Sequence, residues 1–202
     1  MKRFQIVLVV LPLLYWAGCE DDENEGNPVI PGRTIYIVGS DAGGACYWVN
    51  GSRVELPGGD WATDIVVVDG DVYTSGTCGE TACYWINHTR YELPGDWGEG
   101  EAIAVDGDDV YVAWQQYRSD STTFPYDIIS RYSINGGSSW SSERYVTESI
   151  DGTQYIPEIS YSNSIVHLTW HAYSVEGDGT YSVEYASSDD DGDSWELQTQ
   201  CV

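Results

Sequence analysis

The chain has 202 residues, and 33 Asp and Glu against eight Lys and Arg give it a formal net charge of -25 at pH 7. So acidic a surface repels phosphates, which excludes nucleic acid as a partner. Nine Trp and sixteen Tyr separate the chain from acidic disordered sequences and favour a packed β protein.

Residues 1–18 have the features of an export signal. A basic start at Lys2 precedes an apolar run of about eleven residues that ends at Trp16, too short to span a bilayer comfortably. The small residues directly before Cys19 resemble the lipobox of bacterial lipoproteins, although Trp16 stands where that family usually has Leu. The resemblance implies cleavage before Cys19 and lipid attachment to it, which would anchor the protein to a membrane. An ordinary secretory signal is the alternative.

Residues 19–33 follow as an acidic, polar segment, which favours a solvated tether between the lipid and a folded domain. An acidic run after a lipidated Cys also resembles the surface-export signal of some Gram-negative lipoproteins. These resemblances imply a cell-envelope location at the outer membrane, on its periplasmic or its cell-surface side.

The remainder, residues 34–202, repeats one unit of four short antiparallel strands. The pattern of residues 34–39 returns at 71–76, 109–114 and 164–170, and a strand precedes each of the last three. Asn50-Gly51 is a strong hairpin signal between two further strands of the first unit. The expected units cover residues 34–60, 61–96, 97–150 and 151–202.

Tandem four-stranded units predict an all-β fold, a partial β-propeller of about four blades. The first recognisable strand matches the second strand of the later units, so blade one is expected to lack its first strand. An open arc of blades would expose strand edges and apolar blade faces, which is an aggregation hazard. We therefore expect that the chain is a truncated product and that the ring it belongs to is longer. Closure by self-association and a strained four-blade ring are the alternatives.

The last two blades share an eight-residue motif, S-x-[DN]-x-G-x-S-W, at residues 133–140 and 188–195. It resembles the Asp-box of sialidase-type β-propellers, a likeness that covers residues 101–202 well and the earlier units only by architecture. The resemblance implies structural turns on the rim, away from the active site, and sugar contact is the alternative. The turn residues are Ser133, Asn135, Gly137, Trp140, Ser188, Asp190, Gly192 and Trp195.

Other candidate sites are few. Cys78 and Cys83 flank a turn-like insert and are the best candidates for a disulfide, whereas Cys46 has no evident partner. The acidic run 189–193 could suggest calcium, but Gln198 stands where an EF-hand-like loop needs Glu, so a solvated turn is preferred. We predict no metal and no cofactor.

No catalytic residue can be assigned. The early R-I-P motif of sialidases is absent, and Arg53 and Arg90 occupy equivalent outer-strand positions rather than a central cluster. His167 and His171 lie on one face of a strand, where packing is preferred to a metal pair. Trp48 and Trp85 share one repeat position, which indicates blade packing, with glycan stacking as the alternative.

The sequence therefore favours an exported, lipid-anchored β-propeller that presents a binding surface to a carbohydrate or protein ligand, without catalysis. The alternatives are the N-terminal piece of a sialidase-like glycoside hydrolase and an inactive truncated product.

Overall fold

The computed structural model describes residues 33–93, 98–117, 126–147, 152–174 and 179–198, and these form only strands, turns and loops. Within these ranges there is no helix long and apolar enough to cross a membrane. The predicted export signal, Cys19 and most of the predicted tether lie outside the described residues.

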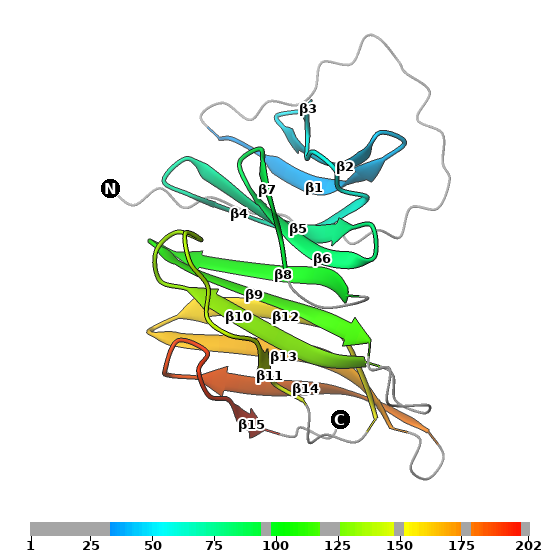
Figure 1. The fold of residues 1–202 in the computed structure, drawn as a ribbon, viewed down its shortest axis with the longest axis vertical. Coiled ribbons are helices and arrows are strands. Elements are labelled where there is room, and N and C mark those ends of the chain that lie inside the picture. The colour runs from blue at the N-terminus through cyan, green and yellow to red at the C-terminus, as the bar shows by residue number, and fades with distance from the viewer. Residues whose placement is uncertain (1–32, 94–97, 118–125, 148–151, 175–178, 199–202) are drawn as a thin grey trace.

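The strands form four antiparallel sheets, stacked in chain order along the long axis of the molecule (Figure 1). Blade 1 has three strands, β1 (Tyr36–Asp41), β2 (Gly44–Val49) and β3 (Ser52–Glu55). Blade 2 has β4 (Trp61–Val68), β5 (Asp71–Cys78), β6 (Thr81–Ile86) and β7 (Thr89–Glu92). Blade 3 has β8 (Gly98–Asp106), β9 (Asp109–Tyr117), β10 (Tyr126–Ser133) and β11 (Arg144–Tyr145). Blade 4 has β12 (Thr153–Ser162), β13 (Ile165–Ser174), β14 (Thr180–Ser188) and β15 (Glu196–Gln198).

This architecture confirms the predicted all-β fold of about four propeller blades. Within each sheet every strand pairs with the next strand in the chain, as tight hairpins require. Asn50 and Gly51 both have positive φ, 49° and 83°, the conformation that a two-residue hairpin turn demands and that this dipeptide tolerates. Blade 1 contains no first strand among the described residues.

The core is divided between the blades. Three clusters of buried apolar side chains hold the stack together, and each is shared by two consecutive sheets, blades 1 and 2, 2 and 3, or 3 and 4. Trp85, Trp114 and Trp170 are the largest of these side chains, one in each cluster, and all are at most 1% exposed. Blades 2 and 3 are each covered on both sides by their neighbours, so their strands carry apolar side chains on both sides.

The first strands β4, β8 and β12 lie next to one another across the blades. Each contains a register irregularity near its start, between Ala62 and Asp64, between Gly100 and Ala102, and between Tyr155 and Glu158. A bulge bends a strand and redirects the side chains beside it. The same irregularity in three consecutive blades therefore gives the inner edge of the stack a repeated local geometry.

Candidate functional site

A pocket of about 330 Å³ opens along the inner edge of the stack. It will be called the inner pocket. Three consecutive blades contribute to it, each through the middle of its first strand. The lining residues are Asp64, Ile65, Val66, Ile103, Ala104, Val105, Glu158, Ile159, Ser160 and Tyr161. The pocket thus has apolar walls and two carboxylates.

Asp64 is fixed in this pocket by the backbone. Its Oδ1 accepts a hydrogen bond of 2.7 Å from the amide of Ile65, and its Oδ2 accepts one of 3.0 Å from the amide of Ile103 in the next blade. Burial raises the pKa of Asp64 above its ordinary value, although the two amide bonds act in the opposite direction. The Asp64 carboxyl group therefore links blades 2 and 3, and its pKa remains above the ordinary value.

Glu158 occupies the same position of the repeat as Asp64. Each follows the bulge of its first strand and pairs with a second-strand residue of its own blade, Asp64 with Ser75 and Glu158 with Thr169. Ala102 holds this position in the blade between them. Burial, and secondarily the negative charge of Asp64, raise the pKa of Glu158. Both carboxyl groups line the inner pocket, whereas the buried side chain of Ala102 packs in the cluster between blades 3 and 4.

A side chain of blade 3 stabilises the bulge beside Glu158 in blade 4. Ile156 adopts a positive φ of 53°, a strained conformation for a β-branched residue. Its amide donates a hydrogen bond of 2.9 Å to Oε1 of the buried Gln115 on β9. The hydrogen bond from Ile156 to Gln115 holds the strained backbone in place. It therefore fixes the position at which β12 bends, and with it the position of Glu158 in the pocket.

The chemistry of the lining restricts what the inner pocket can bind. Its charged groups are carboxylates, and no Arg, Lys or His is among the described residues that line it. An anionic ligand would meet repulsion there. A ligand rich in hydroxyl groups could donate hydrogen bonds to Asp64 and Glu158 while its apolar faces contact Ile and Tyr side chains.

The two predicted turn motifs adopt one geometry. In the first, Ser133 Oγ donates to Asn135 Oδ1 over 2.9 Å and accepts the Gly137 amide over 2.9 Å. In the second, Ser188 Oγ makes the same bonds to Asp190 Oδ1 and the Gly192 amide, over 2.7 and 2.8 Å. Trp140 and Trp195 pack against the clusters beneath the turns. Neither turn contributes to the inner pocket.

Asp190 has its oxygens already engaged. Oδ1 accepts the Ser194 amide over 2.9 Å, and Oδ2 accepts the Ser194 hydroxyl over 2.6 Å. Hydrogen bonds from the side chain and amide of Ser194, and then from Ser188, hold the pKa of this carboxyl at about 2. Over the described part of the chain, no three His, Cys, Asp or Glu side chains are grouped as a metal site would require.

The predicted cysteine pair is bonded in the structure. Cys78 and Cys83 form a disulfide across the β5–β6 hairpin, with their Cα atoms 5.9 Å apart. Cys46, at the equivalent position to Cys83, is buried as a free thiol. Cys201 lies outside the described residues.

The two histidines do not converge. His167 Nδ1 bonds the hydroxyl of Tyr185 at 2.8 Å, and its Nε2 bonds Ser162 Oγ at 3.1 Å. His171 instead stacks on Tyr155, with ring centroids 5.9 Å apart.

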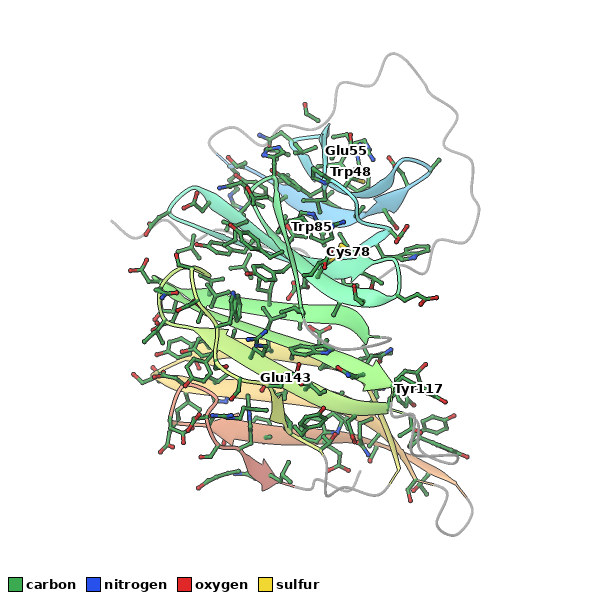
Figure 2. The ribbon with its side chains drawn as sticks, in the orientation of Figure 1. Trp48, Glu55, Cys78, Trp85, Tyr117 and Glu143 are labelled. Carbon is green, nitrogen blue, oxygen red and sulfur yellow. A yellow bond between two sulfur atoms is a disulfide. The ribbon has the colours of Figure 1, made fainter. Side chains whose placement is uncertain are left out.

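Trp48 and Trp85 also differ in surroundings. Trp85 is fully buried and donates to the carbonyl of Pro57 over 3.2 Å, whereas Trp48 is half-buried on the outward side of blade 1 (Figure 2).

Sequence reasoning missed Asp64 and Glu158. Both lie inside first strands, since β4 begins at Trp61 and β12 at Thr153. Counting back from the following hairpin turn aligns Asp64 with Ala102 and Glu158, and this alignment is the signal that could have identified the pair.

No protein-family model and no curated protein sequence matches the chain. Among solved structures, it is similar to an endo-1,4-beta-xylanase from Bacteroides thetaiotaomicron, with TM-score 0.50 and 17% identity over 83% of this chain and 69% of that one. It is also similar to the Bacteroides ovatus xyloglucan PUL GH43B, with TM-score 0.52 and 14% identity over 82% of this chain. The match spans 42% of the latter. These likenesses place the chain in the β-propeller fold class.

Proposed function

We propose that the protein binds a neutral carbohydrate in the inner pocket, through Asp64 and Glu158. The observation that carries this proposal is the recurrence of a carboxylate after the bulge of the first strand in blades 2 and 4, on either side of Ala102. Both carboxylates line one pocket, and both have a raised pKa. Perturbed carboxyl groups in a concave site are a recognised mark of function.

A carbohydrate fits the lining better than the other ligand classes. Sugar hydroxyls donate to carboxylate oxygens, and the CH-rich face of a pyranose packs on apolar and aromatic side chains such as Tyr161. The two solved structures described above are named for xylan and xyloglucan. Their names make xylan and xyloglucan the first ligands to test on this chain.

We extend the proposal to the location of the protein. Attachment of lipid to Cys19, followed by the acidic segment of residues 20–25, would tether the propeller at the outer membrane. A glycan-binding domain on such a tether would encounter polysaccharide outside the inner membrane. Mass spectrometry of the mature N-terminus tests this part separately, because an unmodified first residue other than Cys19 would contradict it.

Calorimetry tests the ligand site. Purified protein is titrated with xylohexaose and with a xyloglucan oligosaccharide, and binding is expected for at least one of them. Asp64→Asn and Glu158→Gln should each weaken binding by about tenfold or more, because a buried hydrogen bond to a charged group contributes about 1.5–3 kcal/mol.

A matched control separates the effect of losing a carboxylate in the inner pocket from the effect of changing the net charge of the protein. Glu143→Gln removes one carboxylate at the outer side of blade 3, away from the inner pocket (Figure 2). It should bind the same oligosaccharides as the unmodified chain does. Equal loss of affinity in Glu143→Gln and Glu158→Gln, or no binding to either sugar, would contradict the proposal.

One observation favours a second function, glycoside hydrolysis. Such reactions use two carboxyl groups, one of them kept protonated by a raised pKa, and the inner pocket contains two with raised pKa values. Incubation with xylohexaose and with 4-nitrophenyl β-xylopyranoside distinguishes the two functions. Release of shorter sugars or nitrophenol, abolished in both Asp64→Asn and Glu158→Gln, would establish hydrolysis.

A further inference from the structure

Within the part of the chain that the structure describes, the two ends of the stack expose faces whose equivalents in the other blades are covered. We call the side of a blade that faces the preceding blade its front face, and the side that faces the following blade its rear face. Blade 1 presents its front face at one end, and blade 4 presents its rear face at the other (Figure 1). The internal repeat shows what each face contacts when it is covered.

The front face of blade 1 repeats that of blade 2. Trp48 pairs with Ile37 and Arg53, as Trp85 pairs with Thr74 and Arg90. Blade 1 covers the front face of blade 2 completely around Trp85, which is 0% exposed and donates to the Pro57 carbonyl. Arg90 in turn donates to the carbonyl of Gly58 over 3.3 Å. Trp48 and Ile37 have the same arrangement and lack a covering blade among the described residues.

The rear face of blade 4 likewise repeats that of blade 3. Ile128 and Gln115 pair on blade 3, at the positions that Val183 and His171 occupy on blade 4. Blade 4 buries Ile128 fully and donates its Ile156 amide to Gln115. On blade 4 itself, Val183 is 47% exposed, and the neighbouring Tyr181 is 72% exposed. Val183 and Tyr181 are thus an exposed apolar pair on the face whose equivalent in blade 3 is covered by blade 4.

From these comparisons we propose that the rear face of blade 4 binds the front face of blade 1 of a second copy of this chain. The two faces are complementary because front and rear faces of the same repeat already pack together three times within the molecule. The contact would be head to tail, with different surfaces on the two partners. The contact residues Val183 and Tyr181 lie on β14, two strands away from β12, which carries Glu158, so this contact can be tested separately from the carbohydrate site.

The charge of the chain sets the expected salt dependence. Each copy carries a formal net charge of -25, so two copies repel each other at long range. Salt screens this repulsion, while the apolar contact around Trp48 and Val183 persists. Association should therefore become tighter as salt is raised, the opposite of an association driven by ion pairs.

Sedimentation equilibrium tests the proposal on the full chain in density-matched detergent, after non-reducing electrophoresis has excluded intermolecular disulfides. The unmodified chain should self-associate. Trp48→Glu and Val183→Glu should each weaken self-association by about tenfold or more, the effect of removing a central interface residue. Trp61→Glu and Ile134→Glu introduce the same charge at exposed apolar positions on neither end face, and they should leave the association unchanged.

Mixing the two variants identifies the geometry. Trp48→Glu keeps an intact rear face and Val183→Glu an intact front face, so a mixture should form a one-to-one complex at a concentration at which each variant alone is monomeric. Ile37→Glu and Tyr181→Glu replace them if circular dichroism shows that either is unfolded. A monomeric unmodified chain would overturn the proposal. An affinity of either variant for itself that equals that of the unmodified chain, or a mixture that associates no more tightly than the single variants do, would also overturn it.

Discussion

The indole Nε1 of Trp140 donates a hydrogen bond of 2.7 Å to the hydroxyl oxygen of Tyr84, joining the turn after β10 in blade 3 to the middle of blade 2. The two rings are also in contact, with centroids 4.9 Å apart. Tyr84 is buried, and this burial raises the pKa of its hydroxyl to about 12. The turn motif therefore stabilises the interface between two blades as well as its own hairpin.

Loss of this bond should destabilise the fold. Trp140→Phe keeps an aromatic ring and leaves the buried Tyr84 hydroxyl without its indole donor, which should lower the free energy of unfolding by about 1–3 kcal/mol. Urea denaturation measures the change. In Tyr84→Phe/Trp140→Phe both polar groups are gone, so the double variant should lose less than the sum of the single losses. Strictly additive losses would show that the bond contributes nothing.

The second turn should be sensitive to acid. The folded-state pKa of Asp190, about 2, lies below its ordinary value of 3.8. Its carboxylate therefore stabilises the fold above about pH 3.8, and this contribution disappears as the pH falls towards 2. Asp190→Asn should flatten the loss of stability across this interval, measured by urea midpoints at successive pH values.

The first turn supplies the matched control. Asn135 makes the equivalent bonds without an ionisable group, its Oδ1 accepting the Ser139 amide over 2.8 Å. Asn135→Asp should thus steepen the loss of stability over the same pH interval. Identical acid profiles for Asn135→Asp, Asp190→Asn and the unmodified chain would refute this account.

Two equivalent glycines should respond differently to substitution. A Cβ at Gly76 would overlap the carbonyl oxygen of Trp61 on the neighbouring first strand, whereas one at Gly39 would meet only a carbon of Trp48 at 3.6 Å, an ordinary contact. Gly76→Ala should lower the free energy of unfolding by about 1–3 kcal/mol, and Gly39→Ala should stay within about 0.5 kcal/mol of the unmodified chain. Equal losses would indicate that another strand also lies against Gly39.

We expect the ionised Glu158 side chain to favour oligosaccharide binding and to lower the stability of the fold at pH 7. Its pKa is raised above 4.5 in the folded state, so ionisation disfavours the fold, and stability falls as the pH rises through the interval between the two values. Glu158→Gln removes that charge. It should be at least as stable as the unmodified chain at pH 7 while losing oligosaccharide affinity, as thermal melts and calorimetry would show. A lower melting temperature at pH 7 would contradict this.

The sequence predicted the propeller architecture because the repeats have clear local signals. Alternating apolar residues, the Asn50-Gly51 turn and the recurrence of tyrosine at Tyr36, Tyr73 and Tyr111 each specify a strand or hairpin directly. The three-stranded blade 1 of the described residues also agrees with the alignment, which begins at a second strand.

The inner pocket could not be predicted in the same way. The sequence does not show that a bulge precedes Asp64 and Glu158, and the pocket forms only where the first strands of three blades meet. Their approach also depends on how sharply blades 2 to 4 curve around a common edge. Curvature arises from packing between sheets, for example Gln115 against Ile156, residues 41 positions apart.

Each apolar cluster belongs to two sheets, and this arrangement has a consequence for the order in which the molecule opens. An inner blade contributes to two clusters and an end blade to one. Unfolding should therefore begin at blade 1 or blade 4 and advance towards the middle, as in linear repeat arrays. Amide hydrogens of β1–β3 and β13–β15 should exchange before those of β5 and β9. A partner that covers an end face would slow exchange throughout the stack, because it would close the place where opening starts.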